Sequence, residues 1–178
     1  MDCQMDYQMS SQIADFRSVE AAEFRTAMRN LASGVAIVAT GAGAARRGLT
    51  VSSVASLCME PPCLLVGINA TSETHDAILA SGRFAVSLLG SDQHDLALRF
   101  AGRDGSKGAE RFGTARWDQG MTDVPVLHTA ICALECVLHQ HQAIGTHGLF
   151  VGRIVATRGS DGNPLVNFQG ALHTLPPH

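Results

Sequence analysis

Apolar positions occur mainly in short runs and alternations along this chain, which is typical of β-strands and not of long helices. Residues 35–40 are apolar and β-branched, residues 41–45 form a glycine-rich turn, and residues 48–51 continue the pattern after it. This order predicts a β-hairpin. Residues 63–68 follow a pair of prolines as one uninterrupted apolar run, which predicts a strand buried on both faces.

Four further segments predict strands. They are residues 83–89, 129–139, 149–157 and 164–168. In the second of these, alternate positions carry apolar side chains that would share one face of a strand: Cys132, Leu134, Cys136 and Leu138. The same segment is also compatible with a helix.

Three short helices are predicted from helical apolar spacing and from residues that begin or end helices. They cover residues 19–32 before Gly34, a segment from Ser72 to Gly82, and a segment from an N-cap at Ser91 to Gly102 that turns Leu96 and Phe100 inward. Residues 103–111 predict a charged, glycine-rich loop. Short strands at close spacing with few brief helices predict a mainly β barrel in a single domain.

The composition fits one folded domain, because 46% of the 178 residues are hydrophobic and only 16% are charged. The formal charge is -3 and no basic run exceeds Arg46-Arg47, which argues against a nucleic-acid binder. Aromatic residues make up 5% of the chain, so small and β-branched residues must build the core. No apolar run reaches the roughly 18 residues that a membrane span needs.

The first residues and the cysteines favour a cytoplasmic protein. Residues 1–12 are polar and lack the basic-then-apolar order of a secretory signal, so a mobile leader is expected. Five cysteines at irregular spacing predict reduced thiols. Cys58 and Cys63 have no base nearby in the sequence and are expected to be buried and inert. Cys132 and Cys136 would lie about 13 Å apart along a strand, too far for one zinc ion.

Three segments carry candidate chemistry. Residues 50–56 are rich in serine and threonine, and can bring hydroxyl and backbone N–H groups to an anion or a flat heterocycle, or simply form a polar edge strand. Ser72-Glu73-Thr74 begins a helix and is either a phosphate site or an ordinary cap. His147 lies between glycines at the mouth of a strand, where an exposed imidazole is expected, with a plain surface histidine as the alternative.

A dinucleotide-binding turn is a further hypothesis, since Gly41 and Gly43 follow an apolar strand. In such a turn the glycines open directly onto a helix, whose N-terminus holds the pyrophosphate. Here Arg46 stands at the position of the third glycine, and the residues that follow are strand-like. An ordinary hairpin is therefore favoured over a Rossmann dehydrogenase.

In order and spacing, these segments resemble the flavin reductase-like family, the short FMN-binding split barrels that supply reduced flavin to two-component monooxygenases. The resemblance runs from about Phe24 to His173 and rests on several short motifs together. These include Phe24-Arg25, Ser33-Gly34-Val35, Gly48-Leu49-Thr50-Val51-Ser52-Ser53, Pro61-Pro62, Gly82-Arg83-Phe84-Ala85-Val86, Arg99-Phe100-Ala101-Gly102, Pro125-Val126-Leu127, Gly145-Thr146-His147, Pro164-Leu165 and Gly170-x-x-His173.

The resemblance implies a mainly β, Greek-key split barrel over residues 19–175, and residues 1–18 before it are the expected mobile leader. It also implies a flavin site. The isoalloxazine ring would lie along Leu49, Thr50, Val51, Ser52, Ser53, Val54 and Ala55, near Leu65 and Val66, with Phe100 and Ala101 closing part of the pocket. Ser72, Glu73 and Thr74 would hold the flavin phosphate. His147, as the catalytic residue, would lie with Gly170 and His173 on the nicotinamide side.

The implied activity is reduction of FMN or FAD by NADH or NADPH in a homodimer, with delivery of reduced flavin to a partner monooxygenase or halogenase. In such a reaction the hydride passes between cofactors while the protein supplies alignment and a screened pocket. One alternative is a flavin- or haem-binding split barrel without rapid NAD(P)H turnover. The other is the Rossmann dehydrogenase.

Overall fold

The computed structural model describes residues 17–159 and 161–175. The chain divides into two compact units between Leu31 and Ala32. In the first unit, the described part contains helix α2 (Ala21–Met28), which has no buried residue. This helix is shorter than the predicted range of 19–32, because Asn30 and Leu31 donate backbone hydrogen bonds three residues back instead of four. The predicted leader, residues 1–18, lies almost wholly outside the described residues.

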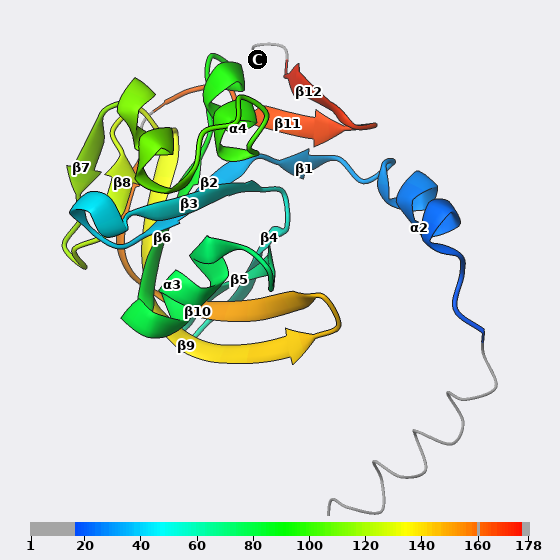
Figure 1. Ribbon diagram of the computed structural model, residues 1–178, viewed down its shortest axis with the longest axis horizontal. Coiled ribbons are helices and arrows are strands. Elements are labelled where there is room, and N and C mark those ends of the chain that lie inside the picture. The colour runs from blue at the N-terminus through cyan, green and yellow to red at the C-terminus, as the bar shows by residue number, and fades with distance from the viewer. Residues whose placement is uncertain (1–16, 160, 176–178) are drawn as a thin grey trace, which may run out of the picture. The chain divides into compact units, whose positions relative to one another are not determined.

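The second unit is built on antiparallel sheets (Figure 1). The largest has seven strands in the order β3 (Arg47–Val51), β2 (Ala36–Thr40), β6 (Arg83–Leu88), β9 (Cys132–Ile144), β10 (His147–Gly159), β5 (Pro62–Asn69) and β4 (Val54–Met59). A three-stranded sheet contains β1 (Ser33–Gly34), β11 (Leu165–Phe168) and β12 (Ala171–Thr174), and a two-stranded sheet contains β7 (Trp117–Gln119) and β8 (Pro125–Leu127). The mainly β fold class is confirmed.

The two edge strands of the large sheet are consecutive in the chain. Strand β3 ends at Val51 and β4 begins at Val54, so that Ser52 and Ser53 join the two edges. Ser53 is fixed to β5, because its hydroxyl donates to the carbonyl of Gly67 at 2.7 Å and its own carbonyl accepts from the Gly67 N–H at 3.1 Å. The sheet therefore curls into a barrel that stays split between β3 and β4.

The predicted hairpin at residues 35–51 is confirmed as β2 and β3, with the 3₁₀ turn η1 (Gly43–Ala45) between them. The antiparallel return rules out the Rossmann turn, which requires a helix after the glycines. Residues 132–139 of the segment predicted at 129–139 lie in strand β9, so its alternative as a helix is wrong. Strand β12 is an element that the apolar pattern did not predict.

Short helices close the second unit. Helix α3 (Glu73–Ser81) begins after Ser72 and ends at Gly82 as predicted, with Gly82 in the left-handed conformation (φ 66°). Helix α4 (His94–Phe100) begins after Gln93 rather than at Ser91. The buried Gln93 side chain fixes the start of this helix, because its oxygen accepts a hydrogen bond from the Gly90 N–H and its amide donates to the Thr129 carbonyl. Part of the predicted loop 103–111 belongs to the 3₁₀ helix η2 (Gly108–Thr114).

Strand β2 is fully buried and separates two hydrophobic cores. Ala36 and Val38 face the barrel interior, where they pack with residues of β5, β6, β10 and with Ile78 of α3. Ile37 and Ala39 face the opposite side, against residues of α4, η2 and β8. This alternation is the period of two that a strand imposes, and it places α3 and α4 on opposite sides of the β2–β3 hairpin. Of the described residues, no helix is long and apolar enough to cross a membrane.

Candidate functional site

Strand β3 lies between two pockets. The first, here called the basic pocket, has a volume of about 300 Å³ and is lined by Arg47, Gly48, Leu49, Ser72, Glu73, Thr74, Lys107, Gly108 and Arg111. The second, the strand-edge pocket, has a volume of about 220 Å³ and is lined by Val35, Thr50, Val51, Ser52, Ala97, Leu98, Ala101, Arg103, Asn167, Gly170 and Leu172. The first half of β3, from Arg47 to Leu49, therefore lines the basic pocket, and Thr50 and Val51 line the strand-edge pocket.

The first turn of α3 forms one wall of the basic pocket. The Ser72 hydroxyl accepts a hydrogen bond from the backbone N–H of His75 at 3.2 Å, which caps the helix as the sequence predicts. Thr74 is 3% exposed, whereas the Glu73 side chain is largely exposed and pairs with Arg47 (Nε to Oε2, 2.9 Å). The free N–H groups of a helix N-terminus attract anions, while Glu73 opposes them.

Arg111 joins the opposite wall to β3. Its guanidinium donates to the carbonyls of Gly48 (2.9 Å), Phe100 (3.2 Å) and Ser106 (3.1 Å). Arg99 of α4 donates to the carbonyls of Arg111 and Glu110, which fixes the same loop from behind. Two arginines therefore hold residues 106–111 against the edge of the barrel.

Asp104 supports this loop through its carboxylate. It accepts from the hydroxyl and the backbone N–H of Ser106 and pairs with Arg99. These hydrogen bonds, with the Arg99 charge added, lower the pKa of Asp104 below its ordinary value. The loop is therefore anchored by a carboxylate that stays ionised.

Gly48 is required for the close approach of β3 to the core beneath it. A Cβ at this position would lie 2.9 Å from Cε1 of Phe100 and 3.1 Å from the carbonyl oxygen of Val38. Phe100 is 1% exposed and packs edge-on against Phe112 at a centroid distance of 5.0 Å. Phe100 therefore supports the pocket floor from below and does not line either pocket.

The hydroxyls of residues 50–56 serve partly structural purposes. The Thr50 hydroxyl donates to the Ala97 carbonyl at 2.7 Å, which fixes β3 on α4, and the Ser53 hydroxyl is bonded to Gly67 as described above. Ser52 is exposed and lines the strand-edge pocket. On its far side from β2, strand β3 has no strand partner within the part of the chain that the structure describes. This edge leaves backbone groups available to a ligand.

The other predicted flavin contacts are distributed unevenly. Leu49, Ala101 and Gly170 line one or other of the two pockets. Val54 and Ala55 begin β4 on the far side of the split. Val66 is fully buried in the barrel interior and Leu65 is half-buried on the same strand, so neither reaches the two pockets.

The predicted nicotinamide-side residues are exposed and lie on separate sheets. His147 is the first residue of β10 in the large sheet, and its Nδ1 lies 3.0 Å from the Thr146 hydroxyl. His173 lies on β12 in the three-stranded sheet, with Nε2 3.2 Å from the Phe168 carbonyl. His147 and His173 thus lie on different sheets, and each has its own neighbouring polar group.

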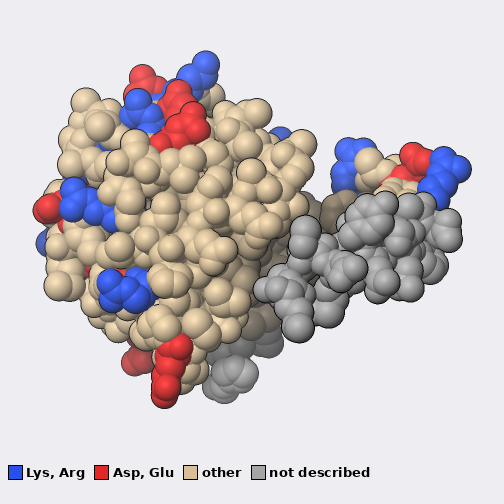
Figure 2. All heavy atoms as spheres, turned by 90° about the horizontal axis from the view of Figure 1, so that it is seen from below, with Lys and Arg blue, Asp and Glu red and all other residues tan. Residues whose placement is uncertain are grey.

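Sequence reasoning missed the cations of the basic pocket, namely Arg47, Lys107 and Arg111. The signals existed, because Arg46-Arg47 is a basic pair and residues 103–111 are a charged loop. Neither signal indicates that positions some 60 residues apart meet beside Glu73, which is what the Arg111 to Gly48 hydrogen bond achieves across 63 residues. On the face of the molecule that Figure 2 shows, lysine and arginine side chains occur in small groups, some of them beside aspartate or glutamate.

A wider hollow of about 670 Å³ lies beside α4, lined by residues such as Asp92, Asp95 and Thr129. It contains none of the predicted site residues and mixes acidic with basic side chains. Among the described residues, no group of three or more histidines, cysteines or carboxylates is placed to hold a metal ion. A further pocket of about 340 Å³ is lined by Val54 and Ala55, but the two pockets beside β3 hold more of the predicted site residues and are the candidate site.

Comparison with known proteins identifies the family. A sequence model described as "Flavin reductase like domain" matches residues 28–176. The chain belongs to this family. A flavin reductase-like relative, the FMN reductase (NADH) RutF of Pseudomonas syringae pv. syringae, is 36% identical over 165 residues, which is 92% of each chain. The reductase component of 4-hydroxyphenylacetate 3-monooxygenase from Salmonella typhimurium is 36% identical over 85% of this chain and 90% of its own.

A solved structure agrees with these relatives. BorF, the flavin reductase component of a bacterial two-component tryptophan halogenase, superposes with a TM-score of 0.82 at 30% identity, over 89% of this chain and all of BorF. The predicted family and the split-barrel fold are therefore confirmed. The chain's own residues also suit a flavin phosphate. Three cationic side chains and the N-terminus of α3 line the basic pocket, which lies beside the open edge of β3.

Proposed function

We propose that this chain is an NAD(P)H-dependent flavin reductase that binds its flavin along the open edge of β3. The observation that carries the proposal is the basic pocket, which combines Arg47, Lys107 and Arg111 with the N-terminus of α3. A phosphate monoester is the ligand that such a set of donors favours. FMN is therefore the flavin that we expect the site to prefer over riboflavin.

The position of the basic pocket determines where the ring would lie. Arg47 to Leu49 line the basic pocket and Thr50 to Ser52 line the strand-edge pocket. A ligand with its phosphate at α3 would extend along β3, with its ring toward Ser52 and Ala101. Backbone groups on the free edge of β3 would meet the polar rim of the ring, and the small side chains there allow close approach.

When bound, the flavin supplies the acceptor for a hydride that NAD(P)H donates. The contribution of the chain is positional, as it holds the phosphate, orients the ring and excludes water from one face. We place His147 on the nicotinamide side, at the mouth of β10. The predicted roles of Gly170 and His173 belong to the same side.

The decisive experiment is steady-state oxidation of NADH and NADPH by the purified chain with FMN, FAD and riboflavin in turn. We expect oxidation that depends on added flavin, with the lowest KM for a flavin that carries a phosphate. Oxidation independent of flavin, or failure to bind any flavin, contradicts the proposal. Flavin binding without NAD(P)H oxidation would instead support a flavin-binding split barrel that does not turn over.

We also propose that the chain is a homodimer that delivers reduced flavin to a separate monooxygenase or halogenase. Several large apolar side chains, including Leu79 and Ile144, are exposed in the single chain, and a second copy would cover some of them. Light scattering of the purified chain tests the dimer.

We also propose a cytoplasmic location, because the four cysteines in the described part of the chain are free thiols.

A further inference from the structure

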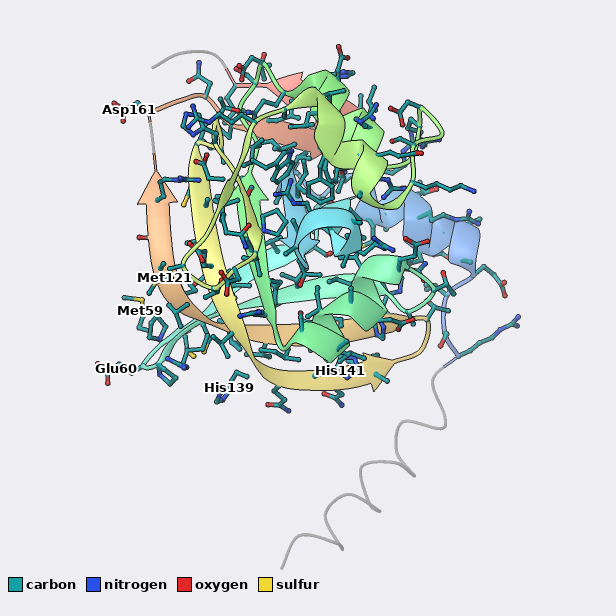
Figure 3. All side chains as sticks on the ribbon, turned by 60° about the vertical axis from the view of Figure 1, so that its left-hand side comes forward. Met59, Glu60, Met121, His139, His141 and Asp161 are labelled. Carbon is teal, nitrogen blue, oxygen red and sulfur yellow. The ribbon has the colours of Figure 1, made fainter. Side chains whose placement is uncertain are left out.

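Two cysteines face each other across the β4–β5 hairpin. Cys58 and Cys63 are directly paired in the antiparallel register, after an irregularity in β4 between Ser56 and Cys58. Met59 and Glu60, which Figure 3 labels at the tip of this hairpin, lie in the short connection between the two cysteines. The predicted burial of both thiols is correct for Cys63, which is 3% exposed, and wrong for Cys58, which is exposed because β4 is an edge strand.

The register brings the two residues within the range that a disulfide requires. Directly opposed residues of an antiparallel pair have Cα atoms about 4.5–5.5 Å apart and side chains on the same face. A disulfide spans Cα separations of about 4.4–6.8 Å. The register is therefore compatible with a disulfide between Cys58 and Cys63.

The two thiols differ in accessibility. The Cys58 Sγ donates to the Pro61 carbonyl at 3.1 Å and is open to solvent. Burial raises the pKa of the Cys63 thiol, and its interaction with Cys58 raises it further, while Arg153 opposes the change. Arg153 is the register partner of Cys63 on β10, so that Cys58, Cys63 and Arg153 form one row across three strands.

We propose that Cys58 and Cys63 form a reversible intramolecular disulfide when the protein meets hydrogen peroxide. The accessible Cys58 thiolate attacks the peroxide O–O bond, which gives a sulfenic acid at Cys58 and releases water. The Cys63 thiolate then attacks the Cys58 sulfur, which forms the S–S bond and releases a second water. Two thiols are thereby oxidised by one peroxide, and a dithiol reductant restores both.

The proposed function supplies a source of peroxide, because a flavin reductase produces reduced flavin. Reduced flavin that escapes into aerated water transfers two electrons to O₂ and yields hydrogen peroxide. The disulfide would protect the exposed Cys58 from irreversible oxidation to sulfinic acid. It would also fix the end of β4, whose first residues are Val54 and Ala55 of the predicted flavin segment.

The test uses the full chain treated with hydrogen peroxide alone, so that its outcome is independent of reductase activity. We expect intact-mass and peptide mapping to show loss of two hydrogen atoms and a Cys58–Cys63 cross-link, reversed by dithiothreitol. In Cys63→Ser, dimedone should trap a sulfenic acid at Cys58 at least about tenfold more than in the natural chain. Cys63→Ala supplies the same comparison if the serine variant fails to fold.

Cys132→Ser is the matched control, since Cys132 is a half-buried thiol outside the hairpin and its loss should leave the cross-link unchanged. The closing step should accelerate up to about tenfold per pH unit below the Cys63 pKa, because only the thiolate attacks. The proposal is overturned if Cys58 resists labelling by a small disulfide reagent in the folded protein. Equal dimedone trapping in the natural chain and in Cys63→Ser, or a disulfide between two chains, also overturns it.

Discussion

The two sides of the candidate site differ in how completely the fold assembles them. On the phosphate side, Arg111 donates to three carbonyls, Ser72 caps α3 and Gly48 rests on Phe100. On the proposed nicotinamide side, His147 and His173 are exposed, and each has one neighbouring polar group within hydrogen-bond distance. In the proposed binding mode, the flavin phosphate therefore meets a pocket that the fold has already formed, whereas the proposed nicotinamide side is an exposed surface. Substitutions on the two sides should therefore separate affinity from rate.

The largest effect is expected from Arg111→Ala. It removes a charge from the basic pocket and leaves the carbonyls of Gly48 and Phe100 without their donor. In the proposed binding mode Arg111 also donates to the flavin phosphate, and a hydrogen bond from a charged group contributes about 1.5–3 kcal/mol, so the Kd for FMN should rise about 10–100-fold. Fluorescence titration with FMN and with riboflavin measures it, and Arg111→Lys is the charge-preserving control. A loss of the same size for riboflavin would show that Arg111 does not act through the phosphate.

Gly48→Ala tests whether the phosphate side depends on close packing. The added Cβ would meet Phe100 at 2.9 Å and the Val38 carbonyl at 3.1 Å. Overpacking of this kind costs about 1–3 kcal/mol of unfolding free energy. Thermal or urea unfolding measures the loss, and Gly113→Ala is the control, because a Cβ at Gly113 meets nothing within 4 Å. Equal stabilities of the two variants would contradict the close approach of β3 to Phe100.

His147→Ala examines the opposite side. We expect kcat to fall about tenfold through poorer alignment of the nicotinamide, with the Kd for FMN nearly unchanged. Stopped-flow reduction and FMN titration measure the two quantities separately. Because the Thr146 hydroxyl lies 3.0 Å from Nδ1 of His147, Thr146→Val should give a weaker form of the same effect. Parallel losses of rate and affinity in His147→Ala would place this histidine on the flavin.

Glu73→Gln should improve the phosphate side slightly. It removes the one carboxylate of the basic pocket and frees Arg47 from its ion pair at 2.9 Å. Exposed pairs contribute at most about 1 kcal/mol, so FMN affinity should rise about two- to fivefold at low salt. Riboflavin affinity serves as the internal reference and should not change. Weaker FMN binding would mean that Glu73 orients Arg47 toward the phosphate.

The smallest effect is expected for Asp104, whose protonation at low pH should reduce the stability of the fold. Because the pKa of Asp104 is lowered in the folded protein, this carboxylate stabilises the fold above its unfolded pKa. The stabilisation is lost as pH falls through the lowered value, where Ser106 and Arg99 lose their acceptor. Unfolding followed over about pH 3 to 6 should show a shallower acid loss in Asp104→Asn than in the natural chain. Identical slopes would remove Asp104 from the loop anchor.

Much of the fold could be predicted from local pattern. The β2–β3 hairpin, strand β6 and helix α3 each follow from apolar runs and from terminal residues such as Gly82, whose signals act within a few positions. Helix α4 begins after Gln93 and not at the predicted Ser91, because the buried Gln93 side chain donates a hydrogen bond to Thr129, which is 36 residues away in the chain. Local capping rules cannot anticipate such a partner.

The candidate site divides in the same way. By itself, the sequence determined the helix start at Ser72-Glu73-Thr74, the small-residue strand beside it and, through ordered motifs, the family. Only the tertiary structure decided that Arg47, Lys107 and Arg111 share one pocket with Glu73, that Val66 is core, and that Cys58 is exposed opposite Cys63. The physical reason is that charge clustering and burial depend on register and on the split between β3 and β4. A local pattern determines which side chains of a strand share a face, but it does not determine which strands lie at the edges of the sheet.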